Sequence, residues 1–199
     1  MNQSHTERRV AGQLVPAVGL GCMNLSHAYG IPPAAKDAER VLITAFEIGV
    51  RHFDTAPLYG FGHNEDLLGP ILEPFRDQIF LASKCGLTGV DGQRVIDGRP
   101  ETLIKTCDES LRKLRTEVLD LCYLHRWDKN IPIEESIGAL QDMIQQGKIL
   151  SIGLCEVSAD TLRKVHAIQP VAAVQSEYSL WSRNAEIAVL DACRELDIA

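Results

Sequence analysis

The chain repeats one pattern, in which a short apolar run is followed by an amphipathic run at roughly 30-residue spacing. The apolar runs are hydrophobic nearly throughout instead of alternating with polar residues, which is typical of strands buried in a parallel sheet. They cover residues 17–20, 51–55, 79–83, 119–124, 150–154 and 171–175. This recurrence restricts the fold to architectures built from βαβ units.

Helices are expected between these strands, because apolar residues recur there with helical spacing. The sequence predicts helices over residues 38–49, 100–114, 137–147, 158–165 and 189–196. Two architectures contain such units: an open doubly wound sheet and a closed barrel. An open sheet that binds a dinucleotide carries a glycine-rich turn after its first strand. Residues 19–24 lack the third glycine of that fingerprint, which favours the barrel.

Polar residues repeatedly stand where an apolar run ends. They are Asp54-Thr55, Ser83-Lys84, His125-Arg126, Cys155-Glu156 and Gln175-Ser176-Glu177. The carboxyl ends of the strands of a parallel barrel meet around one mouth, where the active residues of such enzymes lie. We therefore predict an α/β fold of the (β/α)8 TIM-barrel type, with one functional site built from these strand ends.

The number of strand–helix units falls short of a closed barrel. About six units are present, whereas such a barrel needs eight units and typically about 250 residues. We expect residues 1–199 to form a single, incomplete barrel domain whose C-terminal part is missing. Residues 196–199 are interpreted as a helix end followed by the start of a seventh strand. The alternative is a complete six-unit open sheet, which would leave two exposed edges.

Four residues near the strand ends suit the reduction of a carbonyl group. Asp54 and Lys84 end neighbouring strands, where opposite charges favour each other's ionised form. Tyr59 lies on the loop after Asp54, and a nearby ammonium lowers the pKa of a phenol toward neutral pH. His125 can donate a hydrogen bond to a carbonyl oxygen. Each residue alone is more commonly a packing or surface residue, so it is their shared placement that predicts catalysis.

In this order and spacing, the strand ends resemble those of the aldo-keto reductase family, and most strongly its short-loop bacterial-type members. The resemblance covers essentially the whole chain. The segments that carry it are residues 53–60 (FDTAPLYG), 64–69 (NEDLLG), 82–84 (ASK), 124–126 (LHR), 152–158 (IGLCEVS) and 174–178 (VQSEY). Residues 8–16 resemble the hairpin that plugs the bottom of the family's barrel, and residues 19–23 resemble its first strand and nicotinamide-facing turn.

The resemblance implies an NADP(H)-dependent enzyme that reduces small aldehydes and ketones to alcohols. Tyr59 would be the proton donor and Lys84 would lower its pKa. Asp54 would hold Lys84, and His125 would orient the carbonyl. Hydride would come from NADPH, and NADH is the alternative hydride donor. The implied cofactor contacts are Gly21, Met23, Asp54, Cys155, Glu156 and Gln175, and the residues that could line the substrate pocket are Met23 and Trp127.

The chain departs from the family's pattern at one strand end. Cys155-Glu156 stands where many members have Ser-Asn. A thiol is a weaker donor and acceptor than a hydroxyl, so the contact with the cofactor's carboxamide is expected to be weaker there. In the family, the residues that stack on the nicotinamide and grip the 2′-phosphate follow the seventh and eighth strands. The expectation of NADP over NAD therefore rests on the family alone.

Composition and charge limit the classes of binding partner that the chain is expected to have. The chain has 20 Lys and Arg against 27 Asp and Glu, a net charge of −7, so nucleic acid is not an expected partner. The six cysteines have neither C-x-x-C nor zinc-type spacing, which predicts reduced thiols and no metal. No apolar stretch reaches about 18 residues, so no membrane span is expected. The polar N-terminus, MNQSHTERRV, lacks the core of a signal peptide and favours the cytoplasm.

Two other hypotheses stay open at this point. The chain could be a non-catalytic nicotinamide-binding or regulatory module, because a fold alone does not establish a function. It could also be an inactive truncated fragment, because a barrel without two of its units keeps unpaired strand edges. Turnover of a carbonyl compound and binding of NADPH distinguish these hypotheses. The sequence predicts neither the physiological substrate nor the oligomeric state.

Overall fold

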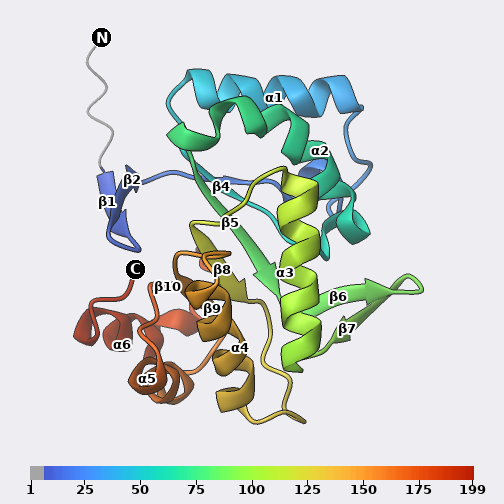
Figure 1. The fold of residues 1–199 in the computed structure, drawn as a ribbon. Coiled ribbons are helices and arrows are strands. Elements are labelled where there is room, and N and C mark those ends of the chain that lie inside the picture. The colour runs from blue at the N-terminus through green and yellow to red at the C-terminus, as the bar shows by residue number, and fades with distance from the viewer. Residues whose placement is uncertain (1–6) are drawn as a thin grey trace.

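The computed structural model describes residues 7–199 and contains a six-stranded parallel sheet in the order β10-β9-β8-β5-β4-β3 (Figure 1). Its strands are β3 (Leu20–Gly21), β4 (His52–Asp54), β5 (Phe80–Cys85), β8 (Leu121–Leu124), β9 (Ile152–Cys155) and β10 (Ala173–Gln175). The helices are α1 (Ala35–Glu47), α2 (His63–Leu72), α3 (Pro100–Leu114), α4 (Ile133–Gln145), α5 (Ala159–Ile168) and α6 (Val189–Glu195). The expected alternation of strand and helix is confirmed, and the sheet is a half-barrel.

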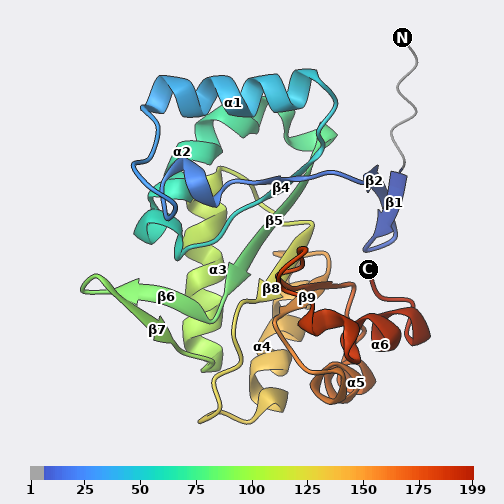
Figure 2. The same ribbon diagram turned by 180° about the vertical axis from the view of Figure 1, so that it is seen from behind.

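Two elements were not predicted from the sequence. One is α2, which contains Gly69 and Pro70 and buries the polar residues Asn64 and Glu65, so its sequence lacks an amphipathic pattern. Gly69 is required by close packing, because a Cβ there would lie 2.0 Å from the carbonyl oxygen of Lys113 at the end of α3. The other is the hairpin of β6 (Leu87–Val90) and β7 (Gln93–Ile96), which projects from the body of the molecule in Figures 1 and 2.

Side chains alternate between the two faces of the sheet. On the outer face, Phe53, Leu81 and Leu154 join a large core with the helices. On the inner face, Phe80 and Tyr123 belong to a second, smaller core that also contains other strand residues. The apolar character of both faces explains why the strands are hydrophobic nearly throughout.

The N-terminal hairpin, β1 (Glu7–Val10) with β2 (Gln13–Pro16), packs at the amino ends of the strands. Val15 is buried in the inner core. The Gln13 side chain donates a hydrogen bond to Asp120 (3.2 Å), which immediately precedes β8 and also pairs with Arg76 (2.9 Å). The hairpin therefore lies at the end of the sheet opposite the carboxyl ends of the strands, as expected for residues 8–16.

The last residue of the chain continues the sheet. The backbone of Ala199 accepts a hydrogen bond from Val174 (2.8 Å) and donates one to Ala172 (3.2 Å), beside β10. This pairing agrees with the expected start of a further strand after residue 196. Within residues 7–199, no helix has the length and apolar character needed to cross a membrane.

Candidate active site

Alternation along two strands leads directly to candidate residues. On β5, the inner series that begins with Phe80 and Ala82 reaches Lys84. On β8, Tyr123 belongs to the inner core. His125 lies two residues further along the chain, just beyond the end of the strand, and so continues the inner series. Lys84 and Tyr123 are register partners, so the two series run side by side toward the same mouth.

Neighbouring strands add two more residues to this mouth. Asp54 ends β4, one position after the outward-facing Phe53, and pairs in register with Ala82. Gln175 ends β10 and pairs with Cys155 on β9. The Gln175 Nε2 donates a hydrogen bond to Asp54 Oδ2 (3.0 Å). Because β9, β8 and β5 lie between these two strands in the sheet, this bond shows that the curved sheet brings its strand ends together.

The Lys84 ammonium is fixed in the site by an ion pair and a hydrogen bond. Its Nζ lies 2.5 Å from Asp54 Oδ1 and 2.8 Å from the carbonyl oxygen of Thr55, with no exposed side-chain surface. Burial lowers the Lys84 pKa, but the carboxylate of Asp54 and the neighbouring Tyr59 act in the opposite direction and raise it to about 12. The ammonium is therefore charged at neutral pH, as the predicted Asp54–Lys84 pair requires.

Tyr59 is held close to this ammonium. It begins the 3-10 turn η2 (Tyr59–Gly62), and Lys84 Nζ lies 4.9 Å from the centroid of its ring. The expected lowering of the Tyr59 pKa is wrong for this structure. Burial raises the pKa of the phenol, and the opposing effect of Lys84 does not compensate. Sequence reasoning included the nearby cation but had no measure of the desolvation of the ring.

His125 stands beside the tyrosine as a neutral imidazole. The two ring centroids are 6.1 Å apart with the planes at 90°. Burial lowers the His125 pKa to about 3, helped by the positive charges of Lys84, Arg126 and Arg94. Its buried Nδ1 has no hydrogen-bond partner among residues 7–199. The structure therefore brings Asp54, Tyr59 and His125 together around the buried ammonium of Lys84.

Asn64 is a positioning residue that sequence reasoning did not single out. Its fully buried amide accepts a hydrogen bond from Thr55 Oγ1 (2.6 Å) and donates to the Cys22 carbonyl (2.8 Å) and Ser26 Oγ (2.7 Å). The carbonyl of the same threonine holds Lys84. Asn64 thereby ties the loop after β3 to the end of β4. The only sequence signal was its place in the segment NEDLLG.

A cavity of about 440 Å³ opens between these strand ends. It contains Tyr59 and His125 together with four of the predicted cofactor or pocket residues, Met23, Cys155, Glu156 and Gln175. The remaining lining residues are His27, Tyr29, Leu58, Leu87, Arg94, Arg126, Ser176 and Glu177. In residues 7–199, no group of three or more His, Cys, Asp or Glu side chains could hold a metal ion.

A model of the aldo/keto reductase family matches residues 17–199. The chain belongs to this family. The probable aldo-keto reductase 1 of Glycine max is 42% identical over 187 residues, which are 92% of this chain and 54% of that protein. The chain thus spans about half the length of this curated relative.

Solved structures agree with the family assignment. Aldo-keto reductase AKR11C1 from Bacillus halodurans, in its holo form, is 26% identical with a TM-score of 0.87, covering 97% of this chain and 64% of its own. The glycerol dehydrogenase AKR11B4 from Gluconobacter oxydans is 30% identical with a TM-score of 0.88, covering 99% of this chain and 62% of its own.

The strand end that departs from the aldo-keto reductase pattern has local partners of its own. Cys155 Sγ lies 3.8 Å from Gln175 Oε1, and burial raises the pKa of the thiol to about 12. Glu156 adopts a left-handed backbone conformation with φ of 53°, which costs less for Asn than for Glu. Its Oε1 accepts a hydrogen bond from the backbone N–H of Glu177 (2.6 Å).

Three of the predicted cofactor or pocket residues do not line the cavity. Asp54, whose carboxylate is bonded to Lys84 and Gln175, is one of them. Trp127 is absent from the cavity lining, contrary to its predicted place in the substrate pocket. Its ring packs against the outer core, its Nε1 donates to the Ile131 carbonyl (3.1 Å), and Lys129 Nζ lies 3.1 Å from the ring centroid. Gly21 pairs with Asp54 at the edge of the sheet, with open space where a Cβ would be; it does not line the cavity.

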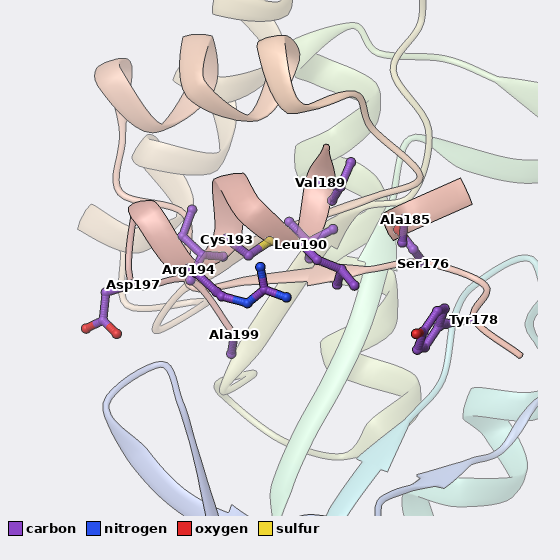
Figure 3. A pocket seen from close by; sticks show the side chains of 11 residues that line it. Ser176, Tyr178, Ala185, Val189, Leu190, Cys193, Arg194, Asp197 and Ala199 are labelled. Carbon is purple, nitrogen blue, oxygen red and sulfur yellow. The ribbon is translucent and has the colours of Figure 1, made fainter. Parts of the chain in front are cut away.

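A second cavity, of about 570 Å³, lies beside β10 and α6 (Figure 3). Residues such as Val189, Leu190 and Cys193 give it an apolar wall, and Ala199 reaches its rim. It contains none of the four predicted catalytic residues. The cavity with Tyr59 and His125 is therefore the candidate active site of this member of the aldo-keto reductase family.

Proposed function

We propose that this chain carries the catalytic centre of an NADPH-dependent reductase of small aldehydes and ketones, with Tyr59 as the proton donor. The observation that carries this proposal is the buried Lys84 ammonium, bonded to Asp54 and 4.9 Å from the Tyr59 ring, in a mouth shared with neutral His125. We infer NADPH in place of NADH only from what the family resemblance implies; the comparison itself gives the family and not the cofactor.

The polar lining of the cavity fits a nicotinamide. Gln175 and Cys155 present an amide and a thiol, and Met23 presents an apolar side chain, a combination suited to a flat ring that carries a carboxamide. These residues, with Glu156, would hold the cofactor. When bound, the cofactor would supply a hydride to the carbonyl carbon.

Each of the four residues has a task in the reaction. Burial keeps the Tyr59 pKa above its ordinary value, so the phenol carries the proton that a general acid must deliver to the developing alkoxide. The Lys84 ammonium stabilises the phenolate that remains, and Asp54 fixes the ammonium in place. The imidazole of His125 is uncharged, and its N–H donates a hydrogen bond that orients the carbonyl oxygen.

We also place the protein in the cytoplasm. All six cysteines are free and buried, and burial raises the pKa of most of these thiols, including Cys22 and Cys107. Such thiols are poorly reactive small hydrophobes that suit a reducing compartment.

Replacing Tyr59 by phenylalanine tests the proposed acid. Tyr59→Phe should lower kcat for a small aldehyde by about 10²–10⁴-fold, the usual contribution of a positioned acid, while NADPH binding followed by fluorescence changes little. Tyr178→Phe is the matched control, because that exposed hydroxyl bonds Glu186 away from the mouth. Unchanged turnover in Tyr59→Phe would rule out this role. Tight NADPH binding by the wild-type protein without turnover of any carbonyl would instead support a regulatory module.

A further inference from the structure

The cavity of the candidate active site has a cationic side chain that the proposed chemistry does not use. Arg94, on β7, lines the cavity together with Tyr59 and His125. We propose that Arg94 forms an anion subsite, so that the preferred substrates are carbonyl compounds that also carry a carboxylate or a phosphate. This inference rests on the proposed function and adds a substrate class to it.

The register of the β6–β7 hairpin explains the direction of Arg94. Arg94 lies directly opposite Gly89 in the antiparallel pair, and residues in such a pair have side chains on the same face. A Cβ at Gly89 would lie 1.8 Å from Cδ1 of Phe61, so this face of the hairpin is the one that packs on Phe61. Arg94 therefore projects from the face that meets the loop of Tyr59.

Phe61 fixes the hairpin to the candidate proton donor. It lies in the same 3-10 turn as Tyr59, in a left-handed conformation with φ of 53°. Its ring meets the edge of His27 at a centroid distance of 6.1 Å, and His27 stacks on Tyr59 at 6.3 Å. The hairpin, Phe61 and Tyr59 thus form a continuous contact, which sets the position of Arg94 relative to the reacting end of the cavity.

The charge of Arg94 is available to a ligand. Within residues 7–199, its guanidinium makes no salt bridge and no side-chain hydrogen bond. Asp97, the nearest acidic residue after it in the sequence, is paired with Arg99 (2.5 Å). The positive charge of Arg94 nevertheless contributes to the low pKa of His125. A guanidinium binds carboxylate and phosphate groups through paired N–H donors.

The other charged groups that line the cavity have hydrogen-bond partners of their own. Glu156 accepts the backbone N–H of Glu177, and Glu177 accepts a hydrogen bond from Ser182 Oγ (2.5 Å). Arg126 Nη1 donates to the His125 carbonyl (2.7 Å). The acidic groups follow β9 and β10, whereas Arg94 comes from the hairpin after β5. This separation would orient a substrate with its anionic group toward the hairpin and its carbonyl between Tyr59 and His125.

Matched substrate pairs test the anion subsite. The probes are 4-oxobutanoate against butanal for a carboxylate, and glyceraldehyde 3-phosphate against glyceraldehyde for a phosphate. In the wild-type protein, kcat/KM should favour the anionic member of at least one pair. Arg94→Gln should remove about tenfold of this preference, as expected for the loss of one charge-assisted hydrogen bond, while kcat/KM for the neutral members stays within about twofold. The pair that responds identifies the anionic group.

Two controls separate this inference from the proposed function. Arg112→Gln removes the same charge from the exposed face of α3, and an equal effect there would overturn a local subsite. Binding of 4-hydroxybutanoate and butan-1-ol, measured by saturation-transfer NMR, gives a readout that needs no turnover. Weaker binding of the hydroxy acid to Arg94→Gln supports the subsite even if no carbonyl is reduced. Equal binding, or turnover of neutral aldehydes with no anion preference, overturns it.

Discussion

Four residues, Asp54, Tyr59, Lys84 and His125, could be placed at one site from the sequence because each stands at or just after the end of an apolar run. Parallel strands bring such ends together, and the contacts of Lys84 with Asp54 and the Tyr59 ring agree with this expectation. The effect of desolvation on the pKa values of these residues could not be predicted from the sequence. Burial dominates the pKa of both Tyr59 and His125, and burial depends on how the helices and loops pack around the strand ends.

The neutral state of His125 predicts a dependence of stability on pH. Its pKa is about 3 in the folded protein against an ordinary value of 6.5. The unfolded chain therefore binds the proton first, so this contribution to stability is fully present above pH 6.5 and is lost as pH falls toward 3. In urea unfolding between pH 7 and pH 4, the wild-type midpoint should fall more steeply than that of His125→Asn. The exposed His63→Asn is the control, and identical slopes for wild type and His125→Asn would contradict the prediction.

At the scale of elements, strands and amphipathic helices were predictable, whereas α2 and the β6–β7 hairpin were not. Helix α2 buries Asn64 and Glu65 and contains Gly69 and Pro70, so the contacts that stabilise it are tertiary and leave no periodic pattern. The hairpin is a short insertion after β5 that packs on the rest of the molecule through the face that carries Gly89. Both elements matter for the site, because one contributes Asn64 and the other contributes Arg94.

Strand β9 depends on a glycine at an inward-facing position. A Cβ at Gly153 would lie 2.4 Å from Cδ1 of Tyr123, whose ring lies 5.9 Å from Lys84 Nζ. Gly153→Ala should therefore destabilise the protein by about 1–3 kcal/mol through overpacking, measured as a lower urea midpoint. Gly138→Ala on α4 is the control, because its Cβ meets nothing within 4 Å and alanine favours a helix. Equal or higher stability of Gly153→Ala would show that Tyr123 can move freely.

For the whole molecule, the inward curve of the sheet is what converts separate strand ends into a site. The bond between Gln175 on β10 and Asp54 on β4 spans the half-barrel, and the β1–β2 hairpin covers the opposite end of the same interior. Sequence reasoning predicted this architecture from the repeated units, and it predicted the start of a further strand after residue 196, with which the pairing of Ala199 beside β10 agrees. It misplaced Trp127, because the direction of a side chain in the loop after β8 depends on packing that strand periodicity does not describe.

The most direct test of the account is to follow the hydride. The protein is incubated with an aldehyde and NADPH that carries deuterium at the transferable position of the nicotinamide, and the alcohol is analysed by mass spectrometry. The account predicts an alcohol with deuterium on the former carbonyl carbon, formed at a much lower rate by Tyr59→Phe. An alcohol without deuterium, or equal labelling rates in both proteins, would contradict carbonyl reduction at the site built around Lys84.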